Sequence, residues 1–183
     1  MHVPQGVIVN LVHKQGSAGL GGLQAGDVIL AVNGHEIASQ DELEYRIATL
    51  PIDDKAVLRV MRGATILALT IEMKPAPDQP PPDISELDGR LPLSGTIVGN
   101  VSPSLAEKYN LDPFGDGVVI LRIRPGGIAN RLDFRPGDIV RAINTVKVKT
   151  VNELKMLIAK SKGDEWRISV ERAGRTMDFV FRG

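Results

Sequence analysis

The chain carries one twelve-residue motif twice, as Leu23-Gln-Ala-Gly-Asp-Val-Ile-Leu-Ala-Val-Asn-Gly34 and as Phe134-Arg-Pro-Gly-Asp-Ile-Val-Arg-Ala-Ile-Asn-Thr145. The motif is the centre of a longer repeat, because residues 6–49 align with residues 117–160 at an offset of 111 without a gap. This spacing exceeds the length of a solenoid unit, which is about 20 to 50 residues. We therefore expect two domains of the same kind.

Three positions of the motif carry residues that favour turns. Glycine at the fourth position of the motif permits a tight turn with a positive φ, which a side chain would hinder. The aspartate that follows is suited to accept hydrogen bonds from local backbone amides, and the asparagine suits the turn that closes the next strand. These positions are Gly26, Asp27 and Asn33 in the first copy and Gly137, Asp138 and Asn144 in the second.

Strands and helices are expected on both sides of the motif. Runs rich in Val and Ile predict strands over Gly6–Val12, Val28–Asn33, Val57–Arg62 and Thr65–Glu72. Capping boxes at Ser39-Gln-Asp-Glu42 and Thr150-Val-Asn-Glu153 predict helices that run to about Thr49 and Ser161. Ser102-Pro103 opens a further short helix to about Tyr109. Each copy is therefore mostly β with helices (α+β), a small antiparallel sheet capped by one or two helices.

A proline-rich segment, Lys74-Pro-Ala-Pro-Asp-Gln-Pro-Pro-Pro-Asp83, separates the copies. Its prolines remove backbone donors and favour an extended conformation, so it is interpreted as a semi-rigid linker. A ligand for an SH3-like domain is the alternative interpretation. The expected domains are 1–73 and 91–183, with the linker over 74–90.

The composition argues against several classes of function. The 183 residues include 22 basic and 22 acidic side chains and no cysteine. This balance gives no clustered positive charge for nucleic acid or an anionic membrane, and the lack of cysteine excludes disulfides and thiolate zinc sites. The longest apolar run, Val28 to Val32, is far too short to span a bilayer. The start, MHVPQGVIV, does not resemble a signal peptide, so the chain is expected to be cytoplasmic or a processed piece.

No catalytic, metal or cofactor site is expected. The sequence lacks the Gly-Asn/Asp-Ser-Gly-Gly motif of trypsin-like proteases and the Gly-x-Ser-x-Gly elbow. His2, His13 and His35 are interpreted as surface residues, and they form no cluster with metal-ligand spacing. The glycine-rich stretch Gly16–Gly22 lacks the Gly-Lys-Ser/Thr of a phosphate-binding loop. We interpret it as a mobile loop, because interior glycines weaken a helix by about 1 kcal/mol each.

The duplicated motif, followed by a capped helix and two closing strands, strongly resembles a PDZ domain of the bacterial HtrA/Do-like protease type. The resemblance covers residues 6–73 and 91–183, and Gly95–Glu107 looks particularly like the second PDZ domain of Do-like periplasmic proteases. It implies two partly open antiparallel β-barrels or sandwiches. The family layout places the binding loop and strand of the first domain upstream of Gly6, so the first groove is expected to be truncated.

The resemblance also implies a peptide-binding site in the second copy. PDZ domains add the C-terminal residues of a partner to a sheet edge, while a loop of backbone amides holds the terminal carboxylate. The implied site comprises Leu93, Ser94, Gly95, Thr96, Ile97 and Val98 from the loop and strand, and Leu154 and Ile158 from the helix. Thr96 departs from the usual apolar residue. Leu154 and Ile158 are equally well interpreted as plain core, and Trp166 is expected to fill the core.

The resemblance therefore predicts a non-catalytic peptide-binding module of an HtrA/Do-like serine endopeptidase. Its expected partners are C-terminal peptides of unfolded or misfolded proteins, with a homo-oligomer formed through the parent protein, and its expected location is the periplasm. Neither nucleic acid nor membrane insertion is expected. One alternative is the tandem PDZ region of a membrane-embedded site-two metalloprotease. Another is a pure oligomerisation module whose grooves dock onto neighbouring subunits.

Overall fold

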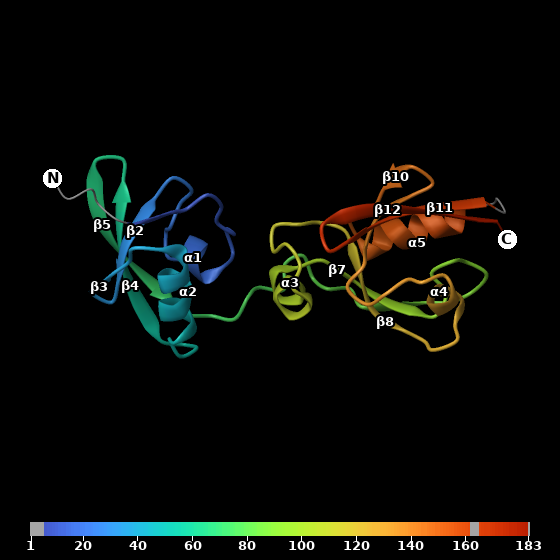
Figure 1. Cartoon of the computed structure of the whole chain (residues 1–183), viewed down its shortest axis with the longest axis horizontal. Helices are drawn as coiled ribbons and strands as arrows, with labels where there is room; N and C mark the ends of the chain where they lie inside the picture. The colour runs from blue at the N-terminus through green and yellow to red at the C-terminus, as the bar shows by residue number, and fades with distance from the viewer. Residues whose placement is uncertain (1–5, 162–164, 183) are drawn as a thin grey trace. The chain divides into compact units, whose positions relative to one another are not determined.

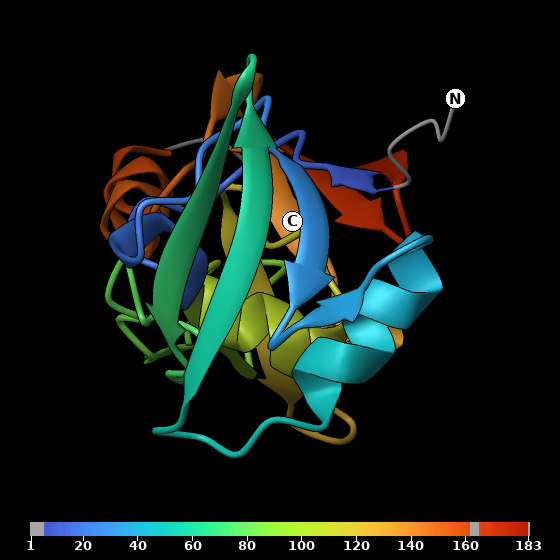
Figure 2. The same cartoon turned by 90° about the vertical axis from the view of Figure 1, so that its left-hand side faces the viewer.

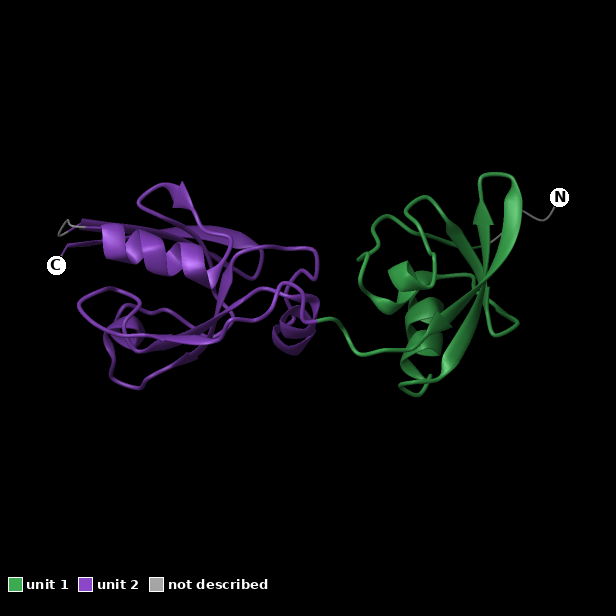
Figure 3. Cartoon of the chain, turned by 180° about the vertical axis from the view of Figure 1, so that it is seen from behind, with its two compact units in different colours: residues 1–77 green, residues 78–183 purple. Residues whose placement is uncertain are grey.

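A computed structural model of the chain describes residues 6–161 and 165–182. The chain divides into two compact units, residues 1–77 (unit 1) and residues 78–183 (unit 2), which Figure 3 distinguishes by colour. Each unit contains one antiparallel sheet and a few short helices, so the predicted α+β class is confirmed.

Unit 1 is built on a sheet whose main path runs in the order β1-β2-β4-β5, with β3 paired to β2. Figure 2 shows the long β4–β5 hairpin in green and the helix α2 in cyan at the side of the sheet. The elements of unit 1 are β1 (Val7–Ile8), α1 (Ser17–Leu20), β2 (Val28–Val32), β3 (His35–Glu36), α2 (Gln40–Ala48), β4 (Lys55–Arg62) and β5 (Thr65–Glu72).

Unit 2 has a larger sheet, in the order β12-β11-β9-β8-β7-β6, with β10 paired to β9. Figure 1 labels most of its elements. They are β6 (Ser85–Leu87), β7 (Thr96–Asn100), α3 (Pro103–Tyr109), β8 (Val118–Ile123), α4 (Ile128–Arg131), β9 (Ile139–Ile143), β10 (Val146–Lys147), α5 (Val151–Lys160), β11 (Glu165–Arg172) and β12 (Arg175–Arg182).

The internal repeat is visible in the order of the elements. From β1 to β5, unit 1 follows the same succession of strands and helices that unit 2 follows from β8 to β12. Unit 2 has three further elements ahead of that succession, the strands β6 and β7 and the helix α3. Within the described residues, unit 1 has no counterpart of these three elements, and no strand pairs with the outer edge of β1.

Two local predictions for unit 1 were wrong. The strand expected over Gly6–Val12 is regular only at Val7–Ile8, because the chain then turns away towards α1. The stretch Gly16–Gly22, expected as a loop, contains the one-turn helix α1. The absence of a side chain at Gly19 allows the backbone to pack closely in this turn, since a Cβ there would lie 2.4 Å from the backbone oxygen of His13.

The expected linker over 74–90 differs from the structure at its C-terminal end. Residues 85–87 form β6, which pairs antiparallel with β7 and is the edge strand of the sheet of unit 2. Leu87 is only 6% exposed and belongs to the core of that unit. The physical reason is that Ser-Glu-Leu provides backbone donors and an apolar side chain, whereas the preceding prolines provide no amide donors.

Each unit has its own hydrophobic core. In unit 1 the core lies between the sheet and α2, where buried Ile29, Val32 and Leu58 contact the partly buried Leu43 and Ile47. In unit 2 the core includes side chains from α5, β7 and the β11–β12 hairpin. Trp166 is 8% exposed within this second core, as expected from the sequence. It therefore provides a fluorescence signal specific to unit 2.

The two predicted capping boxes are confirmed. The Ser39 hydroxyl accepts the amide of Glu42 at the start of α2, and the Thr150 hydroxyl accepts the amide of Glu153 at the start of α5. The Glu153 carboxylate in turn accepts the amide of Lys149 at 2.8 Å. Both helix starts are thus fixed by local hydrogen bonds that the sequence encodes directly.

Thr150→Ala is expected to lower the free energy of unfolding of unit 2 by about 1 kcal/mol, because it leaves the Glu153 amide without its cap. Urea denaturation followed by Trp166 fluorescence measures this loss. Thr150→Ser keeps the oxygen acceptor and is the control, expected to stay within about 0.5 kcal/mol of the wild type. Equal losses for the two variants would contradict a capping role.

Candidate functional site

The candidate site of unit 2 lies where the loop 91–95 and the strand β7 meet the core beneath α5. Leu93, Val98 and Leu154, three of the sequence-predicted site residues, are 0% exposed and share one buried cluster. Ile158 packs against the same cluster and remains partly exposed. The structure thus brings the predicted loop, strand and helix together around one apolar centre.

The strand β7 is hydrogen-bonded on both of its edges. Its inner edge pairs with β8, and its outer edge pairs with β6 in the register Ser85–Val98, Glu86–Ile97 and Leu87–Thr96. Peptide binding by strand addition requires a free edge with unpaired N–H and C=O groups. In this structure the segment β6 of the same unit occupies the edge that the PDZ resemblance assigns to a peptide.

The loop amides predicted to face a carboxylate also have internal partners. The Ser94 amide donates to the Leu91 carbonyl at 3.0 Å, and the Thr96 amide donates to the Leu93 carbonyl at 3.2 Å. The amide of Gly95 donates to the carbonyl of Leu87 at 2.7 Å. The last contact is the important one, because its acceptor belongs to β6.

The conformation of the loop depends on Gly95 and Thr96. Gly95 has a φ of +83°, where a side chain is strained, and a Cβ there would lie 3.3 Å from Cβ of Arg124. Thr96 is fully buried, and its hydroxyl donates to the Leu93 carbonyl at 2.7 Å. The polar residue at a usually apolar position is therefore satisfied locally and helps to close the loop.

Asn100 is a functional candidate that the sequence patterns did not indicate. Its side-chain oxygen accepts the amide of Val151 at 2.7 Å and so joins β7 to the first turn of α5. Its side-chain nitrogen donates to the carbonyl of Pro81 at 2.7 Å. An asparagine at the end of a mostly apolar strand is the only sequence signal for this role, since both partners are distant in the chain.

Each copy of the Gly-Asp motif holds an ion pair between a buried aspartate and a partly exposed arginine. Asp27 is 1% exposed and accepts two hydrogen bonds from Arg62, with distances of 2.7 and 2.8 Å, and one from the Gln24 amide. The hydrogen bonds from Arg62 hold the pKa of Asp27 below its usual value. Asp138 forms the matching pair with Arg172 in unit 2. The motif predicted the local amide contacts of both aspartates but neither arginine partner.

The corresponding region of unit 1 lacks several parts of this arrangement. The helix α2 presents Leu43 and Ile47, both partly buried, at the positions of Leu154 and Ile158. The described residues supply no strand beside α2 that corresponds to β7. The truncated first groove therefore stays a prediction. Among the described residues, unit 2 alone has the loop, the strand and the helix that the PDZ resemblance assigns to a peptide site.

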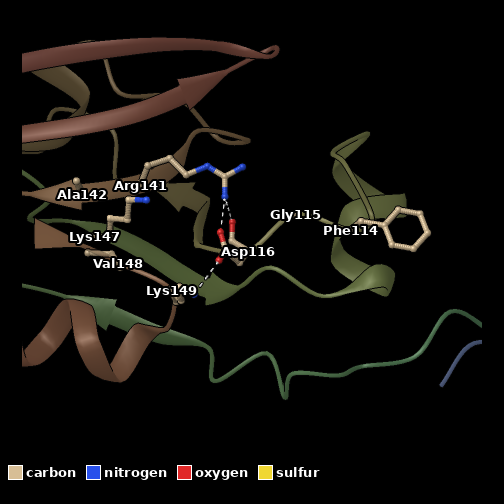
Figure 4. Close-up of a pocket in the computed structure, with 8 residues that line it drawn as sticks. All are labelled: Phe114, Gly115, Asp116, Arg141, Ala142, Lys147, Val148 and Lys149. Atoms are coloured by element: carbon tan, nitrogen blue, oxygen red, sulfur yellow. Dashed lines mark hydrogen bonds and ion pairs between the residues drawn. The ribbon is translucent and has the colours of Figure 1, made fainter. Parts of the chain in front are cut away.

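A separate hollow of about 590 Å³ in unit 2 is lined by residues 114–116, 141–142 and 147–149. Figure 4 shows Asp116 between Arg141 and Lys149. Its carboxylate forms ion pairs with the two cations, at nitrogen–oxygen distances of 3.0 Å to Arg141 and 3.7 Å to Lys149. Arg141 also pairs with Glu171 at 2.9 Å. These charged groups therefore form ion pairs mainly with one another. The lining of the hollow includes no residue of the predicted peptide site.

In the part of the chain that the structure describes, the His, Asp and Glu residues form no group of three that is placed to hold a metal ion. None of the helices in this part of the chain combines the length and the apolar character that crossing a membrane requires.

Comparisons with known proteins identify the family of both units. The sequence matches the PDZ domain family over residues 2–73 and again over residues 119–172. Together with the two sheets, these matches define a tandem of PDZ domains, which are peptide-binding modules. More particularly, the chain is homologous to the PDZ region of DegP/HtrA-like serine endoproteases.

Two relatives illustrate the homology, both described as probable periplasmic serine endoproteases of the DegP-like type. The protein of Chlamydia pneumoniae is 27% identical over 177 residues, which cover 96% of this chain and 34% of that protein. The protein of Marinomonas sp. is 30% identical over 179 residues, which cover 97% and 37% respectively. This chain therefore spans about a third of the length of these curated relatives.

Solved structures give weaker matches. The HtrA-type protease AlgW with decapeptide aligns at a TM-score of 0.44 and 14% identity, covering 85% of this chain and 54% of that chain. The HtrA3 PDZ domain bound to a phage-derived ligand aligns at a TM-score of 0.41 and 18% identity, covering 48% and 80%.

Proposed function

We propose that the chain is a non-catalytic peptide-binding and regulatory module of a DegP/HtrA-like serine endopeptidase. Its second PDZ domain captures the free C-termini of unfolded client proteins by strand addition to β7. The relatives are named as periplasmic, which supports a periplasmic location for the parent protein. Assembly of a homo-oligomer through the parent protein and a role in protein quality control belong to the same proposal.

One observation carries the proposal. A short extended segment, β6, pairs antiparallel with β7. The Leu87 side chain lies in the core, and the Leu87 carbonyl accepts a hydrogen bond from the Gly95 amide. The unit therefore accepts a strand whose end points towards the loop 91–95. A client peptide of the same polarity would place its last apolar side chain and its carboxylate at the same two points.

The energetics are consistent with a useful affinity. Burial of one apolar side chain is worth about 1.5 to 3 kcal/mol, and each ladder hydrogen bond contributes about 0.5 to 1.5 kcal/mol. Loss of freedom on association opposes these gains. A micromolar dissociation constant, about 8 kcal/mol, is the expected result for an accessible groove.

A labelled five-residue peptide that ends in Val or Leu tests the function. We expect a free carboxylate to bind at least tenfold more tightly than the same peptide amidated at its C-terminus, because only the carboxylate carries the charge that the loop amides attract. We expect Gly95→Val to abolish the difference, since a β-branched residue cannot readily adopt the φ of +83°. Fluorescence anisotropy measures both effects.

Gly174→Val is the matched control for this experiment. Gly174 also has a positive φ, +74°, but it lies in the β11–β12 turn, where an added Cβ would have no neighbouring atom within 4 Å. The control introduces comparable backbone strain away from the loop 91–95, and we expect it to keep the preference for the carboxylate. Equal binding of acid and amide by the wild type would contradict carboxylate capture.

A further inference from the structure

The backbone of residues 81–87 follows β7 along its whole length. β6 supplies the three paired residues, and the Pro82 carbonyl then accepts the amide of Asn100 at 2.6 Å. The Pro81 carbonyl accepts the side-chain amide of Asn100 at 2.7 Å. The segment therefore fills the edge of β7 from the loop 91–95 to the start of α3.

The segment has the polarity of a ligand. Antiparallel pairing directs β6 from Val98 towards Thr96, so that its last residue, Leu87, arrives at the loop. There the Leu87 carbonyl accepts a hydrogen bond from the Gly95 amide at 2.7 Å. A carboxylate oxygen of a C-terminal leucine in the same position would accept the same hydrogen bond.

The side chains of β6 also contact the elements that surround the groove. Leu87 is 6% exposed in the cluster that contains Leu154. The Ser85 hydroxyl accepts a hydrogen bond from the Lys155 ammonium of α5 at 2.7 Å. The Glu86 carboxylate pairs with Arg124 at 2.5 Å. Ser85 and Leu87 thus contact α5 and the core, whereas Glu86, which lies between them, pairs with Arg124.

Several of these contacts are of the kind that opens readily. β6 has only three residues, and the side chains of Glu86 and Arg124 are 52% and 56% exposed. Exposed ion pairs contribute little, about 0 to 1 kcal/mol each. Short segments with exposed contacts are the first to open locally while the rest of a domain stays folded.

We propose that Ser85-Glu86-Leu87 is an internal pseudo-ligand that closes the peptide groove of unit 2, and that client C-termini compete with it. This inference rests on the proposed function. The groove is then selective for C-termini that resemble β6, with a hydroxyl residue two positions before a terminal leucine and an acidic residue between them. When β6 leaves β7, three features become available to a client peptide at the same time. They are the edge of β7, the Gly95 amide and the apolar space that the Leu87 side chain had filled.

The test uses a fluorescent peptide with the sequence of residues 81–87, Pro-Pro-Asp-Ile-Ser-Glu-Leu, and a free carboxylate. In the first variant, Gly-Ser-Gly-Ser-Gly replaces residues 84–88, so that the segment keeps its length and loses its leucine. A groove closed most of the time has an affinity reduced by its open fraction. We therefore expect this variant to bind the peptide at least tenfold more tightly than the wild-type chain.

A second variant, Glu86→Cys with Ile97→Cys, locks β6 to β7. The two residues are directly opposite in the register. Opposed antiparallel residues lie about 4.5 to 5.5 Å apart between Cα atoms, which suits a disulfide. The chain has no cysteine of its own, so these are its only thiols. The oxidised protein should bind the peptide at least tenfold more weakly than the same protein after reduction.

The two variants separate the outcomes. Tighter binding by the replaced segment, together with loss of binding on oxidation of the lock, supports the inference. Equal binding by the replaced segment and the wild type, or equal binding by the oxidised and reduced lock, overturns it and leaves the peptide-binding function standing. If neither the wild type, the replaced variant nor the reduced lock binds the peptide while Trp166 fluorescence shows native unit 2, the proposed function fails as well. Should the replaced variant not fold, the comparison of the two redox states decides.

Discussion

Arg62→Met is expected to lower the free energy of unfolding of unit 1 by about 3 kcal/mol at neutral pH. Asp27 is 1% exposed, and Arg62 supplies both charged hydrogen bonds to its carboxylate. The substitution keeps the apolar stem and leaves a buried carboxylate without its cation. For a domain of this size the loss corresponds to a decrease in Tm of about 12 °C or more.

The control is Arg59→Met on the same strand. Arg59 pairs with Glu36 at 3.3 Å, but the two side chains are 48% and 85% exposed, so we expect a loss below about 1 kcal/mol. Hydrogen exchange of the β4–β5 peptides during urea denaturation follows unit 1, while Trp166 fluorescence follows unit 2. Similar losses for the two variants would show that burial of the pair is unimportant.

The effect of Arg62→Met should depend on pH in a defined direction. The pKa of Asp27 is lowered in the folded state. At a pH between the folded and the unfolded pKa, the folded protein therefore binds fewer protons than the unfolded chain. The stabilisation by the pair is complete above the unfolded pKa of about 3.9 and is lost as the pH falls towards the lower folded value. The difference between wild type and variant should therefore shrink below about pH 4. A constant difference from pH 7 to pH 3 would contradict this assignment.

Leu154→Ala is expected to lower the free energy of unfolding of unit 2 by about 3 kcal/mol, because truncation of a buried leucine leaves a cavity that the surroundings fill only in part. Leu154 is 0% exposed in the main core of that unit. Urea denaturation followed by Trp166 fluorescence measures the loss, because Trp166 belongs to the same cluster.

Met156→Ala provides the comparison on the same helix. Its side chain is 53% exposed, so the expected change is within about 0.5 kcal/mol. The pair of variants also separates the two sequence-based interpretations of Leu154. A stable Leu154→Ala protein that has lost peptide binding would mean that Leu154 serves the groove alone and would contradict its role in the core.

Much of the fold follows from local sequence. The repeat at an offset of 111 predicted two domains of one kind, and the capping boxes placed the starts of α2 and α5 correctly. Gly26 and Gly137 have the positive φ values that their turns required. These features depend on neighbouring residues and on backbone sterics, so they can be inferred without knowledge of the tertiary structure.

The candidate site was only partly accessible to such reasoning. The resemblance to PDZ domains assigned the loop 91–95, β7 and α5 to one site, and the structure places Leu93, Val98 and Leu154 of these segments in one buried cluster. The role of these residues in peptide binding remains a proposal. Sequence patterns gave no reason to pair Asp27 with Arg62, because the two are 35 positions apart and charge alone does not identify a partner.

Two PDZ-like domains and the starts of their capped helices could be inferred from the amino-acid sequence. The pairing of β6 with the edge of β7 could not, because it arises only in the folded domain. Ser85-Glu86-Leu87 follows a proline-rich run and is too short to show a strand period, so sequence patterns alone place it in the linker. The segment becomes a strand because the backbone N–H and C=O groups at the edge of β7 pair with it and the Leu87 side chain packs in the core. The edge of β7 and the core are both assembled only when the domain folds.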